Sequence, residues 1–169
     1  SDSTSGIDTN SATITLDTQS ITASVSETGF SYTPAQPLTE GAHTLTVNIT
    51  DNAGNTQTAE TTVTIDTTAP GEVIGFAVEA GDSQITLSWT NPSTDDFVGV
   101  KVMRSTVSIP AGPGDGTLVY QGSDTGYVDS NVAINVTYYY AVFSYDEVFN
   151  YSSGIADEAI IPDTTAPAA

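Results

Sequence analysis

Apolar residues alternate with hydroxyl-bearing ones along most of the chain. In residues 43–50 (HTLTVNIT), Leu45, Val47 and Ile49 fall on one side, and threonine and asparagine fall on the other. A period of two is typical of a β-strand with one buried and one solvated face, and β-branched threonine suits the solvated face. The same alternation recurs at 11–17, 21–26, 61–66 and 84–90. Because no segment of ten or more residues has a helical period, we predict an all-β protein.

Clusters of turn-forming residues separate these segments, as in NAGN (52–55), GDS (81–83) and AGPGDG (111–116). Short strands divided by such turns indicate β-sandwiches. In the first part of the chain we expect five strands, at 11–17, 20–26, 29–33, 42–51 and 56–66. In the second part we expect seven, at 73–79, 83–90, 98–105, 117–121, 125–129, 136–145 and 153–161.

The pentapeptide DTTAP occurs twice, at 66–70 and 163–167, each time after an apolar strand end. Proline fixes its own φ angle and disfavours helix at the preceding residue, so each copy is expected to be a short, stiff, extended joint. A joint that returns after about 100 residues is typical of sandwich domains in a row. We therefore predict two tandem β-sandwiches, with a first domain at 1–66, a linker at 67–70, a second domain at 71–162 and the start of another linker at 163–169.

The charge balance excludes several classes of function. Against 21 acidic residues the chain has two basic ones, Lys101 and Arg104, which gives a formal net charge of −19. Such a chain cannot neutralise a nucleic-acid backbone, and anionic membrane surfaces repel it. No apolar run reaches the roughly 18 residues of a membrane span, so we expect no membrane insertion. Without cysteine there are no disulfides, thiolate metal sites or cysteine nucleophiles.

Few residues suit catalysis, so we expect that the protein is not an enzyme. The single histidine, His43, opens a strand and is expected to be structural, and no second histidine is present for a catalytic triad. No serine lies in a G-x-S-x-G motif. A pair of carboxylates for glycoside hydrolysis stays open on residue counts alone, although the acidic residues lie in turns and at strand ends.

Residues 71–162 resemble a fibronectin type III domain over their whole length. Trp89, in ITLSWTNP, occupies the position of that family's core tryptophan, and Tyr138, in YVDSNVAINVTYYYAVFSYD (127–146), occupies the tyrosine-corner position. Asn135 stands where the family usually has glycine. The resemblance implies a seven-stranded sandwich.

The first segment resembles a bacterial immunoglobulin-like (Big-type) repeat. Residues 40–70 are similar to the last two strands of such a repeat, and 5–17 to a loop and strand that normally lie a quarter of the way into it. The resemblance implies that the first one or two strands are missing from this sequence. Repeats of this kind occur in the stalks of surface adhesins and as spacers in secreted polysaccharide-degrading enzymes.

Acidic turn residues suggest a calcium site at the joint between the two domains. Ca²⁺ takes six to eight oxygen ligands, and since no EF-hand spacing is present, separate loops would have to supply them. In an immunoglobulin-type sandwich, the loops at 91–97 and 146–150 lie at the end where the chain enters the domain. The predicted ligands are Asp66, Asp95, Asp96, Asp146 and Asn150, with Glu40 from the first domain. Equivalent residues in the first domain, Asp8, Asp51 and Asn55, are predicted to form an upstream half-site. The alternative is that all of these are turn formers with solvated side chains.

The aromatic residues near the C-terminus suggest a second type of site. Alternation places Tyr138 and Tyr140 in the core, and it places Tyr139 with Phe143 on the outside, in an exposed strip for sugars or a neighbouring domain. Phe149 and Tyr151 lie just beyond this strip in the chain.

Together these features predict a non-catalytic spacer in a bacterial cell-surface or secreted multidomain protein, an adhesin stalk, with joints stiffened by calcium. Its expected location is extracellular, and its expected partners are neighbouring domains of the same chain, with carbohydrate or a host surface as further alternatives. The alternative function is an accessory or carbohydrate-binding module of a secreted polysaccharide-active enzyme. The short first domain leaves open whether it accepts a strand from another chain.

Overall fold

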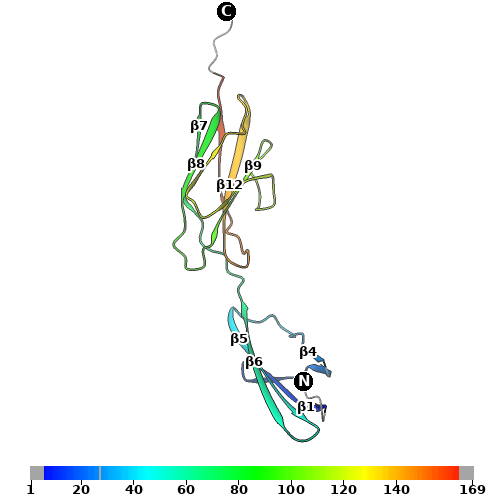
Figure 1. Ribbon diagram of the computed structural model, residues 1–169. Helices are drawn as coiled ribbons and strands as arrows, with labels where there is room; N and C mark the ends of the chain where they lie inside the picture. Colours follow the sequence, from blue (N-terminus) through cyan, green and yellow to red (C-terminus); the bar gives the residue numbers. More distant parts are fainter. Residues whose placement is uncertain (1–5, 27, 164–169) are drawn as a thin grey trace, which may run out of the picture. The chain divides into compact units, whose positions relative to one another are not determined.

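A computed structural model of the chain describes residues 6–26 and 28–163 (Figure 1). These residues form strands, turns and loops without a helix, so they also contain no helix able to span a membrane. The chain divides into two compact units, Ser1–Thr67 and Thr68–Ala169, and the division falls inside the predicted linker. The prediction of an all-β protein with two tandem β-sandwiches is confirmed.

The first unit contains a four-stranded antiparallel sheet in the order β2-β1-β5-β6 and a separate β3–β4 hairpin. Its strands are β1 (Ile7–Leu16), β2 (Gln19–Ile21), β3 (Ser24–Ser26), β4 (Gly29–Ser31), β5 (Gly41–Asp51) and β6 (Thr56–Ile65). The single strand predicted at 20–26 is therefore two strands, β2 and β3, which belong to different sheets.

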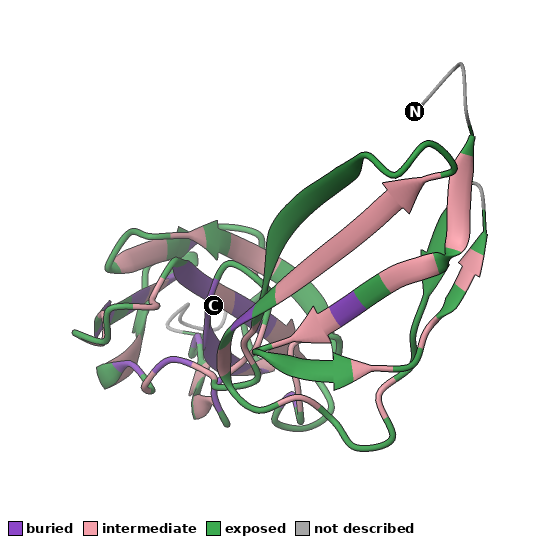
Figure 2. Cartoon of the chain, turned by 90° about the horizontal axis from the view of Figure 1, so that it is seen from below, coloured by how far each residue is buried: buried purple, intermediate pink, exposed green. Residues whose placement is uncertain are grey.

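Little of the first unit is deeply buried. Among its described residues only Ile14 and His43 are buried, at 4% and 6% exposure, and every residue of β6 except Ile65 is exposed (Figure 2). The hydrogen-bonded pairing of its strands is nevertheless regular. Strands β5 and β6 pair without a register shift from Gly41↔Ile65 to Thr50↔Thr56. This long two-stranded ladder runs from the Asp51 turn at one end to the linker at the other.

The second unit is a complete sandwich of two antiparallel sheets, β10-β9-β12-β13 and β11-β8-β7. Its strands are β7 (Ile74–Gly81), β8 (Gln84–Thr90), β9 (Gly99–Ser105), β10 (Thr117–Gly122), β11 (Gly126–Asp129), β12 (Thr137–Tyr145) and β13 (Ile155–Ile160). Each of the seven predicted strands is found within two residues of its expected bounds.

Residues from both sheets fill the core of the second unit. Trp89 is 4% exposed, contacts Phe76 and Tyr120, and donates a hydrogen bond from Nε1 to Asn91 Oδ1 at 3.0 Å. The indole is thus packed on its apolar faces and satisfied at its polar atom, as a buried tryptophan requires. The buried members of this cluster are Val73, Ile85, Leu87, Trp89, Val100, Val102, Tyr138, Tyr140, Val142 and Ile161.

The predicted tyrosine corner is present. The Tyr138 hydroxyl accepts a hydrogen bond from the backbone N–H of Ala133 at 3.0 Å. Asn135, which replaces the usual glycine, adopts a φ of 58°. Asparagine is among the few non-glycine residues that tolerate this left-handed conformation, so the corner survives the replacement.

A buried polar network ties β9, β11 and β12 together. Arg104 Nη1 donates to Asp129 Oδ2 at 2.7 Å, and the Tyr140 hydroxyl donates to the same oxygen at 3.0 Å. Asp129 Oδ1 accepts the backbone N–H of Asn131. Burial raises the pKa of the Tyr140 hydroxyl, and its hydrogen bond to Asp129 raises it further, so this group stays protonated as a donor.

Candidate functional site

The residues of the predicted calcium site at the joint belong to both units: Glu40 and Asp66 to the first, and the remaining four to the second. In the first unit, Glu40 lies beside the start of the linker, because Gly41 pairs with Ile65 at the end of the β5–β6 ladder. The Glu40 carboxylate accepts the Thr67 backbone N–H at 2.9 Å and the Thr67 hydroxyl at 2.7 Å. Glu40 is therefore placed next to Asp66, and its carboxylate holds the first linker residue.

In the second unit, the two predicted loops do gather around the point where the chain enters. The Ser144 hydroxyl, at the end of β12, donates to the Gly71 carbonyl at 2.6 Å, and the Gly71 N–H donates to the Thr94 hydroxyl at 3.4 Å. Asp95 and Asp96 are the central residues of a turn closed by the Phe97 N–H on the Thr94 carbonyl. The sandwich topology thus brings the segments at 71, 94–97 and 144–150 to one end of this unit.

The Asp146 carboxylate accepts hydrogen bonds from its own turn. Its Oδ1 accepts the backbone N–H groups of Val148 and Asn150 at 2.9 and 2.8 Å, and its Oδ2 accepts Asn150 Nδ2 at 2.7 Å. Burial opposes ionisation of this carboxyl, but the hydrogen bonds from Asn150 and Val148 outweigh it and hold the pKa of Asp146 below its usual value. A lowered pKa means that the turn gains stability from the ionised form and loses it as the pH falls through that pKa.

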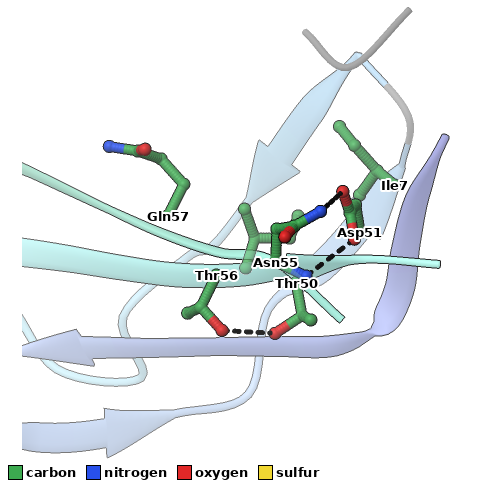
Figure 3. A pocket seen from close by; sticks show the side chains of 7 residues that line it. Ile7, Thr50, Asp51, Asn55, Thr56 and Gln57 are labelled. Atoms are coloured by element: carbon green, nitrogen blue, oxygen red, sulfur yellow. Dashed lines mark hydrogen bonds between the residues drawn. The ribbon is translucent and has the colours of Figure 1, made fainter. Parts of the chain in front are cut away.

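The predicted upstream half-site contains the same turn (Figure 3). Asp51 Oδ1 accepts the N–H groups of Ala53 and Asn55, both at 2.8 Å, and Asp51 Oδ2 accepts Asn55 Nδ2 at 2.7 Å. Asp8 lies on the neighbouring strand, where Ile7 pairs with Asp51, and Asp8 Oδ1 accepts the Asn10 N–H. Asp51 and Asn55, but not Asp8, line an open pocket together with Ile7, Ile49, Thr50, Thr56 and Gln57.

Turn formation therefore explains the pairs Asp51–Asn55 and Asp146–Asn150. Within residues 6–26 and 28–163, no group of three or more His, Cys, Asp or Glu side chains is placed to hold a metal ion. The calcium site at the joint draws on residues of both units and stays a prediction.

The prediction that Tyr139 and Phe143 form an exposed aromatic strip is wrong. Tyr139 is half-buried, and Phe143 is only 2% exposed because it packs with Met103, Ala141 and Tyr151. The chain at Gly154 passes directly over the Phe143 ring: a Cβ at Gly154 would lie 2.3 Å from Phe143 Cε1. Phe143 does point away from the main core, as alternation requires, but a second small core covers it.

The aromatic surface lies instead on the turn between β12 and β13. The Phe149 ring stacks on Tyr145, with centroids 5.6 Å apart and planes 24° apart, and lies 6.4 Å from the Tyr151 ring with planes 28° apart. Phe149 is 57% exposed. Lys101 places its ammonium 5.9 Å from the centre of the Tyr151 ring, within cation–π range.

His43 is a structural residue, in the geometry of a protonated imidazole. Its Nδ1 contacts Asp17 Oδ2 and its Nε2 contacts the Thr39 carbonyl at 2.8 Å. Both partners only accept hydrogen bonds, so both ring nitrogens must donate. The hydrogen bonds to the Thr39 carbonyl and to Asp17 raise the pKa of His43. The hydrogen bond between His43 and Asp17 also lowers the pKa of Asp17.

We expect this pair to make the stability of the first unit depend on pH. A raised pKa in the folded state contributes stability that is complete below the ordinary histidine value of 6.5 and is lost as the pH rises through the folded value. Because His43 is the only histidine, its imidazole proton resonance in NMR reports the pKa directly. A titration midpoint at or below 6.5 would contradict the pairing, and His43→Gln should remove this part of the pH dependence.

Comparison with known proteins agrees with this organisation. A family model described as bacterial Ig-like domain matches residues 3–67. No significant match is found among curated protein sequences.

Two of the similar solved structures contain several domains in a row. Domains A168–A170 from titin are 16% identical over 90% of this chain and 54% of that one, with a TM-score of 0.56. Chicken CNTN1 FN1–FN3 domains are 15% identical over 90% of this chain and 55% of that one, with a TM-score of 0.54. The Clostridium perfringens spore cortex lytic enzyme SleM is 18% identical over 56% of this chain, with a TM-score of 0.42.

The chain spans about half the length of the titin and CNTN1 structures and 29% of SleM. At these identities, the titin and CNTN1 matches establish the fold and nothing about function. Residues 3–67 thus match the bacterial Ig-like family model, and the chain has the fold of tandem β-sandwich domains.

Proposed function

We propose that this pair of domains is a non-catalytic spacer in the extracellular part of a bacterial surface protein or secreted protein, and that it holds its neighbours apart. Bacterial Ig-like and fibronectin-like domains are typical of surface or secreted multidomain proteins. The spacer role, the extracellular location and the neighbouring domains as partners are what we add to that coarser statement.

The observation that carries the proposal is the way the linker is held at both ends. On the side of the first unit, Glu40 binds the N–H and the hydroxyl of Thr67. On the side of the second unit, Gly71 bonds to Ser144 and Thr94, and Val73 is 2% exposed in the core. Only residues 68–70 lie between these anchors, and proline at 70 restricts φ. A joint of this length and composition favours a stiff spacer over a flexible tether.

Two further features support a role without catalysis. The only histidine is bound between Asp17 and Thr39, and Asp51 and Asp146 satisfy the N–H groups of their own turns. The net charge of −19 favours solubility and mutual repulsion of neighbouring molecules, which suits an extended array.

The anchor at Glu40 gives a direct test. The chain has no cysteine, so Thr62→Cys and Gln121→Cys, both at exposed positions, place one spin label on each unit. We expect a narrow distance distribution by double electron–electron resonance, and a clearly broader one when Glu40→Ala removes the two hydrogen bonds to Thr67.

Glu60→Ala is the matched control, since Glu60 is an exposed glutamate on β6 away from the linker. It should leave the distribution unchanged. A distribution that is already broad in the unaltered joint, and that Glu40→Ala does not widen, would contradict a spacer role based on stiffness.

Calcium at the joint is a separate part of the proposal, supported by the oxygen-rich set of Asp66, Asp95, Asp96, Asp146 and Asn150, with Glu40. These are hard ligands of the kind that Ca²⁺ prefers. After chelation, calorimetric titration should show binding at about 10⁻⁴–10⁻³ M, the range of extracellular modules, and Asp66→Asn should weaken it. Absence of heat at millimolar Ca²⁺ would remove the ion from the account.

A further inference from the structure

The chain contains the same turn twice, and the two copies differ at one informative position. Asp51–Asn55 and Asp146–Asn150 share every bond from the aspartate to the third and fifth residues, including the asparagine amide on Oδ2. In each, the fourth residue also donates its N–H to the aspartate carbonyl. The first turn therefore shows which residue this backbone accommodates without strain.

The fourth residue has a positive φ in both turns: 88° at Gly54 and 65° at Phe149. Glycine adopts this region freely, whereas a bulky residue does so at the cost of strain. Phenylalanine thus stands where the other copy has the residue best suited to folding. Strained residues of this kind cluster at binding sites, where the surrounding structure holds them in place.

The strain at Phe149 is not offset by burial. Phe149 is 57% exposed, and its neighbour Val148 is 58% exposed. The turn instead sets Phe149 against Tyr145 and near Tyr151 with nearly parallel ring planes. The outcome is one solvent-facing ring, Phe149, which lies across the buried Tyr145 and beside the half-buried Tyr151. The turn that carries Phe149 is held by the Asp146 hydrogen bonds.

We propose that Phe149 and Tyr151, together with Lys101, form a binding site for a neutral polysaccharide, with the buried Tyr145 packed against Phe149. The C–H face of a pyranose ring stacks on aromatic rings of this kind, because the ring is apolar on its face and polar at its edge. Lys101 supplies a donor for the sugar hydroxyls beside the Tyr151 ring. This role goes beyond that of a spacer.

The net charge of the protein and the small size of the site favour a neutral sugar chain over an acidic glycan, a nucleic acid or a protein. In the described part of the chain, the ion pairs are His43–Asp17 and Arg104–Asp129, so the Lys101 ammonium has no carboxylate within ion-pair distance. One such cation does not offset a net charge of −19, which repels acidic glycans and nucleic acids. The two accessible rings, Phe149 and Tyr151, also fall far short of the roughly 1,000 Å² that a stable protein interface requires. A neutral sugar chain is not repelled by the negative charge and does not need a large contact area.

The test is affinity electrophoresis of the full chain in native gels that contain hydroxyethyl cellulose, xylan or galactomannan, with polygalacturonate as the acidic comparison. We expect at least one neutral polysaccharide to retard the protein. Phe149→Gly should weaken that binding at least tenfold, and Lys101→Gln should weaken it several-fold. Val148→Ser, an equally exposed apolar position in the same turn, should bind as before.

Thermal melting separates binding from folding. Because Gly54 occupies the same position in the matching turn, Phe149→Gly should leave the melting temperature unchanged or raise it. A lower melting temperature would show that the ring cluster serves folding, and would overturn the proposal. So would the absence of retardation by all three neutral polysaccharides, binding that Phe149→Gly does not alter, or equal retardation by polygalacturonate.

Discussion

Replacing Asp129 with alanine should lower the free energy of unfolding of the second unit by about 3–5 kcal/mol, the usual cost of breaking a buried ion pair from one side. The side chains of Arg104 and Asp129 are 14% and 3% exposed. Without the carboxylate, the guanidinium loses its charged partner in a place that water reaches poorly. The Tyr140 hydroxyl, which is fully buried, loses its acceptor at the same time.

Urea unfolding measures this effect, and two variants make the result specific. Asp157→Ala removes an exposed aspartate from β13 and should change stability by less than about 0.5 kcal/mol. Tyr140→Phe removes one bond to Asp129 but leaves the ion pair, so its effect should be near 1 kcal/mol. If Asp129→Ala were as mild as Asp157→Ala, the network would not contribute as we describe.

Gly154→Ala should destabilise the second unit by about 2–4 kcal/mol, from overpacking and a strained backbone together. The glycine has a φ of 84°, and an added Cβ would lie 2.3 and 2.5 Å from two carbons of the Phe143 ring. Phe143 is packed among Met103, Ala141 and Tyr151, so the ring has little room to move away.

A double-mutant cycle with Phe143→Leu identifies the cause. The smaller side chain should recover part of the loss in Gly154→Ala, because it removes the ring atoms that the methyl group meets. Gly112→Ala, where an added Cβ meets nothing within 4 Å, is the control and should change stability little. Additive effects of Phe143→Leu and Gly154→Ala would contradict the clash.

Most of the second unit follows from local patterns in the sequence. Alternation with turn residues located all seven strands, since each strand has a buried face and a defined turn on either side. The positions of Trp89 and Tyr138 follow from the resemblance to a fibronectin type III domain, and their hydrogen bonds with Asn91 and Ala133 join residues close in the sequence.

The errors and omissions concern contacts that are distant in sequence. Alternation showed that Phe143 points away from the main core, but it could not show that the chain at Gly154 crosses over it. The pairing of Arg104 with Asp129 joins strands 25 residues apart and has no local signal. The Asp–Asn turns are visible in sequence as D-x-x-x-N, and the phenylalanine in place of glycine at the fourth position is the signal that points to Phe149.

Differential scanning calorimetry of the full chain tests the central claim that the two units are stabilised separately. We expect two transitions: Asp129→Ala lowers the temperature of one, and His43→Gln lowers that of the other. A single transition that both variants shift equally would show that the chain folds as one body, and would contradict separate stabilisation of the two units.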